Sequence, residues 1–205
     1  GGGGGAPGQN CVTGGAGGSG IVIARVQTGG DAYVDTSSIP NAPTTTPDGF
    51  TYIAEFKASG TLNLKDNGCG TAFDYRVVSG GGGGGSNYGG GGGAGGHRTS
   101  FPGGKKLILS PGTTPVTIGA GGAGGTSNNR GTTGGDSKIS ALFTNGGGGG
   151  GSTPSGEGGA RAGLPGGSGG GNANDSAPEP APSGNVQPTA PGQGNNGGQG
   201  RQGGG

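Results

Sequence analysis

The residues that could do chemistry are few in this chain, and their spacing fits no catalytic or metal-binding pattern. The 205 residues include one histidine, His97, in the run GGHRTS. A Ser/His/Asp triad would have to recruit this side chain from a glycine-rich loop, and the sequence carries no nucleophile elbow. Histidine, cysteine and carboxylate residues do not recur at metal-ligand spacing. The sequence therefore predicts a protein that is not an enzyme and uses no cofactor and no metal.

Glycine-rich phosphate-binding motifs need a separate test, because 65 of the 205 residues are glycine. At this content the pattern GxGxxG recurs by chance and carries no information. The P-loop pattern GxxxxGK[ST] is absent, since Lys106 rather than Ser or Thr follows Gly104-Lys105. A net charge of +1 without a basic block argues against a nucleic-acid partner. No apolar run approaches the ~18 residues of a membrane span.

The two cysteines, Cys11 and Cys69, form an even pair without a histidine, cysteine or carboxylate cluster beside them. Such a pair is typical of a disulfide in an oxidising compartment, which predicts an extracellular protein. Two free thiols are the alternative, and the sequence alone does not exclude them. A bond between them would lie within one chain or link two subunits.

The elements that must carry these residues are short strands, because helix is disfavoured throughout. Glycine costs about 1 kcal/mol relative to alanine in a helix interior. Apolar residues instead alternate in short runs, as in 51–58, where Tyr52, Ala54, Phe56 and Ala58 share one face. Strands are expected at residues 21–26, 51–58, 72–79, 107–109, 116–118 and 139–143, with a turn at 66–68.

Glycine blocks separate these strands, and their placement bears on the choice between disorder and structure. A collagen triple helix is excluded, because glycine does not recur at every third position. Disorder is the alternative, but blocks that directly follow strands, as in VVSGGGGGG and ALFTNGGGGGG, favour packed polyglycine II helices. These are extended helices of three residues per turn, whose N–H and C=O groups bond to neighbouring helices. The predicted fold class is all-β/irregular: short antiparallel strands frame a bundle of packed polyglycine II helices, with essentially no α-helix.

These phrases, together with FKASGTLNL, VTIGAGGAGG and GGAGGSGIVIARV, resemble the glycine-rich domain of phage tail-fibre adhesins and of other bacterial and phage surface proteins. A related module occurs in the extracellular part of anaplastic lymphoma kinase. The resemblance covers residues 51–205 and 1–26. It implies that the glycine segments pack as polyglycine II helices.

The order of the phrases departs from the family pattern, because the closing phrase, residues 14–26, stands at the beginning of the chain. The sequence is therefore a circular permutation of that pattern. It is a true permutant, one period of a tandem array, or a subunit that completes its neighbour's sheet with residues 1–26. The expected parts are a closing segment (1–26), a linker (27–50) and a glycine-rich domain (51–205) with a Pro-rich loop at 174–191. The expected assembly strand contains Ile21, Val22, Ile23 and Val26.

Three functions follow from this reading. The first is a repeating structural subunit of an extracellular filament or fibre, whose partners are copies of itself. The second is a receptor-binding adhesin module of a phage tail fibre, with a cell-surface glycan or an outer-membrane protein as its partner. Its adhesive loop would contain Tyr88, His97, Arg98 and Phe101. The third is an ice-binding protein, which is disfavoured because no face repeats small or Thr residues at regular spacing.

Overall fold

The computed structural model describes residues 1–8, 13–27, 34–35, 44–45, 51–65, 69–153, 161–174, 179–186 and 192–200. This part of the chain contains β-strands and no helix, which confirms the predicted all-β class there. The strands are β1 (Ile21–Gln27), β2 (Val34–Asp35), β3 (Thr44–Thr45), β4 (Thr51–Phe56), β5 (Gly60–Leu64), β6 (Thr71–Val78), β7 (His97–Thr99), β8 (Leu107–Leu109), β9 (Gly112–Thr117), β10 (Ser137–Ile139) and β11 (Leu142–Thr144).

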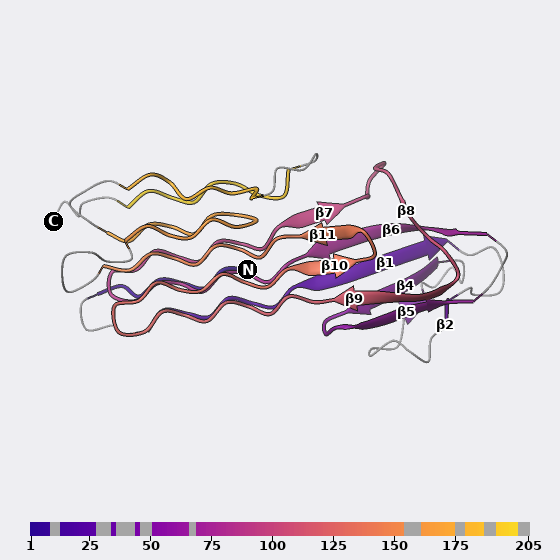
Figure 1. Ribbon diagram of the computed structural model, residues 1–205, viewed down its shortest axis with the longest axis horizontal. Helices are drawn as coiled ribbons and strands as arrows, with labels where there is room; N and C mark the ends of the chain where they lie inside the picture. The colour runs from indigo at the N-terminus through magenta and orange to yellow at the C-terminus, as the bar shows by residue number, and fades with distance from the viewer. Residues whose placement is uncertain are drawn as a thin grey trace.

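The strands form two antiparallel sheets at one end of an elongated molecule (Figure 1). The first sheet has the order β3-β4-β1-β6-β7, and β8 also pairs with β6. The second sheet has the order β11-β10-β9-β5-β2. One hydrophobic core draws on both sheets, and its fully buried side chains include Phe56 and Phe73 of the first sheet and Leu62 and Ile139 of the second.

Alternation along the strands decides which side chains enter this core. In β4, Tyr52, Ala54 and Phe56 are buried, as their shared face predicts. Ala58 lies beyond the end of β4 and is exposed. In a strand, successive side chains point to opposite faces, so the residues between the buried ones face away from the core.

Several predicted strand boundaries were wrong. The run 139–143 is not one strand, because Ser140 has a positive φ of 53° and turns the chain between β10 and β11. The predicted strand 116–118 is the end of the longer β9, which pairs with β5 over five residues. Neither β5 nor β7 was predicted from the sequence.

The predicted linker 27–50 also contributes to the sheets. Within it, β2 pairs with β5 and β3 pairs with β4. The predicted turn at 66–68 lies outside the described residues. Of the Pro-rich loop at 174–191, the structure describes Asn174 and residues 179–186.

The N-terminal segment completes the first sheet of its own chain. Strand β1 lies between β4 and β6 and pairs with both of them. Gln27, at its end, stands directly opposite Thr51, at the beginning of β4. Strands β1 and β4 are therefore antiparallel neighbours joined by residues 28–50.

Candidate functional site

The glycine segments extend lengthwise from one end of the sheets and lie side by side (Figure 1). We call them the glycine bundle. It comprises the segments 1–6, 14–20, 80–85, 89–96, 119–125, 131–136, 146–151, 161–174 and 192–200. The far end of the bundle from the sheets is called the tip.

The segment 80–85 shows how the bundle is held together. Its successive N–H groups donate in rotation to three neighbours, 131–136, 14–20 and 89–96, and then to the same three again, with N···O distances of 2.8–3.0 Å. Its carbonyl oxygens accept from three other segments in the same rotation, also at 2.8–3.0 Å. These three are 146–151, 119–125 and 1–6. The segment therefore repeats every three residues and bonds to six neighbours, with every backbone polar group satisfied.

The close approach of the segments explains why the interior is glycine. A Cβ atom placed on Gly83 would overlap the carbonyl oxygen of Ala123, whereas one placed on Gly4 would meet nothing within 4 Å. The two segments made of six consecutive glycines, 80–85 and 146–151, are buried along their whole length. An unbroken glycine hexad thus indicates an interior segment.

Peripheral segments carry side chains on one side only. In 119–125, Gly119, Gly122 and Gly125 are buried, while Ala120 and Ala123 are exposed. The exposed position recurs every third residue, in step with the hydrogen-bond rotation. Gly103 and Gly112, both outside the bundle, are the described glycines with positive φ. Glycine is therefore required in the bundle by the missing Cβ and not by an unusual backbone conformation.

A buried polar cluster joins the bundle to the sheets. Ser79, Ser137 and Thr144 are each at most 1% exposed. The Ser137 N–H donates to the Ser79 hydroxyl at 2.7 Å, and that hydroxyl lies 2.7 Å from Thr144 Oγ1. The Ser137 hydroxyl in turn accepts from the Gly119 N–H at 3.0 Å. This cluster was not predicted from the sequence, although Ser79 directly precedes one glycine hexad and Thr144 stands two positions before the other.

The tip is also ordered by polar contacts. The turns there place Asn87, Tyr88, Ser127 and Asn128 at positive φ, a region that Asn adopts more easily than most residues. Asn87 Nδ2 donates to Asn128 Oδ1 and to the Thr153 carbonyl, both at 2.8 Å. Two turns that are far apart in the sequence are thereby fixed against each other.

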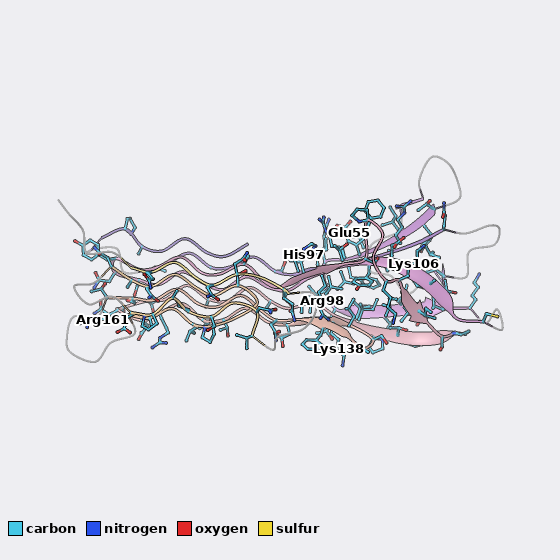
Figure 2. All side chains as sticks on the ribbon, turned by 90° about the horizontal axis from the view of Figure 1, so that it is seen from above. Glu55, His97, Arg98, Lys106, Lys138 and Arg161 are labelled. Carbon is cyan, nitrogen blue, oxygen red and sulfur yellow. The ribbon has the colours of Figure 1, made fainter. Side chains whose placement is uncertain are left out.

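The predicted adhesive residues do not form one patch. Tyr88 lies at the tip and is 39% exposed, whereas His97 and Arg98 begin β7 at the sheet end of the segment 89–96. An eight-residue extended segment separates them by roughly 25 Å at ~3.1 Å per residue. In Figure 2, His97 and Arg98 lie where the bundle meets the sheets. Phe101 follows β7 and is 60% exposed beside the first sheet.

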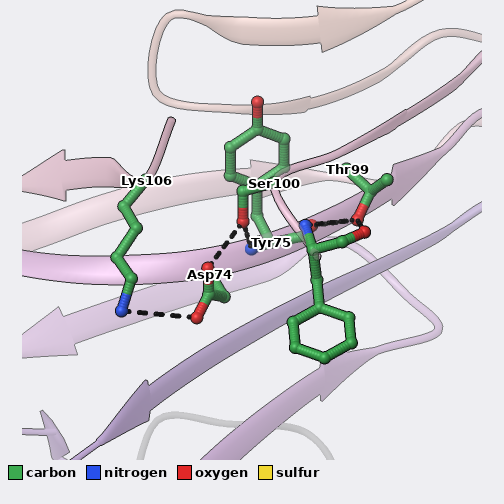
Figure 3. Close-up of polar contacts among 6 residues, drawn as sticks. Asp74, Tyr75, Thr99, Ser100 and Lys106 are labelled. Carbon is green, nitrogen blue, oxygen red and sulfur yellow. Dashed lines mark hydrogen bonds and ion pairs between the residues drawn. The ribbon is translucent and has the colours of Figure 1, made fainter. Parts of the chain in front are cut away.

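A network of polar contacts joins Thr99 and Ser100 to Asp74 and Tyr75 of β6 (Figure 3). The Phe101 N–H donates to Thr99 Oγ1 at 3.1 Å, and this hydroxyl donates to the Tyr75 carbonyl at 3.0 Å. The Ser100 hydroxyl donates to Asp74 Oδ1 at 3.0 Å and accepts from the Tyr75 N–H at 2.9 Å. Thr99 and Ser100 are therefore tied directly to β6, and Phe101 is tied to it through the Thr99 hydroxyl.

The other predicted site residues lie in or near the first sheet. Val22 and Val26 enter the core, and Ile21 and Ile23 are half-buried on the opposite face of β1. Cys69 is exposed, just before β6. Cys11 lies outside the described residues, so its disulfide with Cys69 stays a prediction.

Membrane-spanning helices and metal-binding clusters are both absent from the described part of the chain. None of its segments is a helix long and apolar enough to cross a membrane. It also contains no group of three or more His, Cys, Asp or Glu side chains that could hold a metal ion.

Comparison with known proteins agrees with the glycine bundle. The family model of the glycine-rich domain matches residues 57–205. The chain belongs to this glycine-rich domain family. The matched range contains both buried glycine hexads but neither β1 nor the segments 1–6 and 14–20. No curated protein and no solved structure matches the chain, so the likeness to phage adhesins and the permuted order stay predictions.

His97 makes the stability of this glycine-rich domain depend on pH. Its Nε2 accepts a hydrogen bond from Arg76 Nε at 3.3 Å, which requires a neutral ring. Partial burial, and then the charge of Arg76, lower the pKa of His97 below its ordinary value of 6.5. A histidine whose pKa is lower in the folded state contributes stability that is complete above pH 6.5 and is lost as the pH falls.

We therefore expect His97→Gln, which removes the titrating group, to lose less stability than the wild type between pH 7.5 and pH 5. Urea unfolding of both proteins at the two pH values measures this difference. If both proteins lose the same free energy of unfolding, His97 is not the titrating group.

Proposed function

We propose that this chain is a structural unit of an extracellular fibre, and that its glycine segments are polyglycine II helices. The observation that carries the proposal is the hydrogen-bond rotation of 80–85, which repeats every three residues and reaches six neighbours. Three residues per turn without internal hydrogen bonds is the geometry of this helix type. Flexible loops would have no reason to keep such a register.

The bundle suits a mechanical function because its strength lies in the backbone. A typical hydrogen bond contributes about 1 kcal/mol net, and an interior segment makes one at each N–H and each C=O. This number of bonds offsets the large entropy that glycine loses on folding. A rod held in this way presents few side chains, and it needs no cofactor or small-molecule ligand to be stable.

Copies of the chain can join through residues 1–27. Strand β1 forms its ladders with β4 and β6, and the segments 1–6 and 14–20 bond to segments beyond residue 80. The same segment from a neighbouring copy would make the same contacts, since residues 28–50 connect it to the rest of the chain. Exchange of this kind is a low-cost route to assembly.

Electron microscopy of the purified chain tests the fibre. We expect long filaments of uniform width that contain this one protein, and light scattering should show growth with concentration. Monomers at every concentration would contradict the proposal.

A designed disulfide tests how the copies join. Ile23 and Glu55 stand opposite each other on the outer face of the first sheet, so cysteines placed there can form a bond. In a variant with both substitutions, and with Cys11 and Cys69 changed to serine, exchange predicts a covalent ladder on a non-reducing gel. A monomer band would mean that each copy keeps its own β1.

An adhesin is the second candidate, and the ordered tip favours it. The contact between Asn87 and Asn128 fixes two exposed turns at the end of a rod, which is a suitable place to hold a receptor-binding surface. If the tip binds a cell-surface receptor, Tyr88→Ser should weaken attachment to cells without changing the thermal stability.

A further inference from the structure

The outer face of the first sheet carries charges of both signs, but both of its acids already have cationic partners. Glu55 Oε1 lies 3.3 Å from Lys57 Nζ. Asp74 Oδ2 lies 3.4 Å from Lys106 Nζ, and its Oδ1 accepts the Ser100 hydroxyl. Neither carboxylate forms a described ion pair with an arginine of this face.

Two arginines on this face have no carboxylate partner among the described residues. Arg25 stands opposite Asp74 in the β1–β6 ladder, but its described contact is with the ring of Phe101, whose centroid lies 5.8 Å from Cζ. Arg76 stands opposite Ile23 in the same ladder and donates from Nε to His97. Guanidinium groups carry five N–H donors in a planar fork, so most donors of this pair remain available.

These arginines line a groove of about 270 Å³. It is lined by Ile23, Arg25, Asp74, Tyr75, Arg76, Thr99 and Phe101. Its volume lies just below the ~300–1,000 Å³ of pockets that hold drug-sized ligands, so it fits one ring-sized group. Phe101 is 60% exposed, and its backbone N–H donates to the Thr99 hydroxyl.

The geometry points to a binding site for a sugar ring that carries a carboxylate, such as a uronate residue of an acidic polysaccharide. The guanidinium groups of Arg25 and Arg76 would bind the carboxylate, because planar paired donors match its two oxygens. The apolar C–H face of the ring would pack on Phe101 and Ile23. A phosphate ion would use the charge but leave this apolar surface uncovered. The site does not use the glycine bundle, but Ile23 and Arg25 lie on β1, so exchange of residues 1–27 between copies would take them from one copy and Arg76 and Phe101 from the next.

Titration calorimetry of the full chain with digalacturonate at pH 7.4 tests the site. We expect saturable binding that is lost when the carboxylates of the sugar are methyl-esterified. Arg25→Gln and Arg76→Gln should each weaken binding about tenfold or more, because each removes charge-assisted hydrogen bonds. Lys138→Gln is the matched control: this exposed lysine lies on β10 of the second sheet, and its loss should leave the affinity unchanged.

Phe101→Ser separates a sugar site from a general anion site. The variant should weaken digalacturonate binding by several fold and leave the weak binding of acetate unchanged. Thermal unfolding of each variant checks that the sheet is intact. The proposal is overturned if the wild type does not bind digalacturonate, or if both arginine variants bind it as the wild type does. It is also overturned if a dipeptide with a free C-terminal carboxylate binds as tightly.

Discussion

Replacing Gly148 by alanine is expected to prevent this domain from folding. Gly148 lies in the buried hexad 146–151, and a Cβ there would overlap the carbonyl oxygen of Leu164. Because the atoms it meets are backbone, no side chain can rotate away to make room. We expect a loss of more than about 4 kcal/mol, a large part of the ~5–15 kcal/mol that stabilises a typical domain. Circular dichroism and urea unfolding measure this loss.

Gly4→Ala is the matched control for this substitution. It adds the same methyl group to another segment of the bundle, 1–6, but nothing lies within 4 Å of the Cβ position of residue 4. Its backbone has no positive φ, so alanine fits and reduces the entropy of the unfolded chain. We expect a gain of ~0.4–1 kcal/mol. If the Gly148→Ala and Gly4→Ala variants are equally stable, the glycine segments are not in close backbone contact, and the packing described for the glycine bundle is wrong.

Much of the bundle's organisation can be predicted from the composition of the glycine blocks. Only the two unbroken hexads are free of side chains, and both are interior, whereas Ala120 and Ala123 break their block at the exposed third positions. This spacing is visible in the sequence once the three-residue repeat is known. The identity of each neighbour is not visible, because every glycine segment offers the same donors and acceptors.

The strands also differ in whether they could be predicted from the sequence. Strand β4 was predictable because its apolar residues alternate and enter the core. Strands β5 (GTLNL) and β7 (HRT) were not, because they are short and their extended form depends on pairing with β9 and β6. Their identity as strands is a tertiary effect, and local propensity gives little sign of it.

The arginine groove shows why a site is harder to predict than a fold. Arg25 belongs to β1, Arg76 to β6 and Phe101 to the loop after β7. Arg25 and Arg76 occupy strand positions that alternation assigns to the outer face, so their exposure could be read from the sequence. Their proximity could not be predicted, because it depends on β1 lying beside β6, a strand that begins 44 residues after β1 ends.

Deleting residues 1–27 is the second change with a large expected effect. The deletion removes the central strand of the first sheet, including Val22 and Ala24, which are fully buried. It also removes two of the six neighbours of the hexad 80–85, namely 1–6 and 14–20. We expect the shortened chain to lack a cooperative unfolding transition, measured by circular dichroism and urea titration.

A synthetic peptide of residues 1–27 should restore folding to the shortened chain when it is added separately. Two variant peptides make this result specific. A Cβ at Gly17 would overlap the carbonyl oxygen of Gly81, whereas one at Gly18 would lie 3.4 Å from its nearest neighbour. The Gly18→Ala peptide should therefore rescue and the Gly17→Ala peptide should not. If the shortened chain folds alone, or if both variant peptides rescue equally, the N-terminal segment does not fill the place that the structure gives it. Rescue by the correct peptides would instead mean that this place accepts a segment from another molecule, which is the step that fibre assembly by exchange requires.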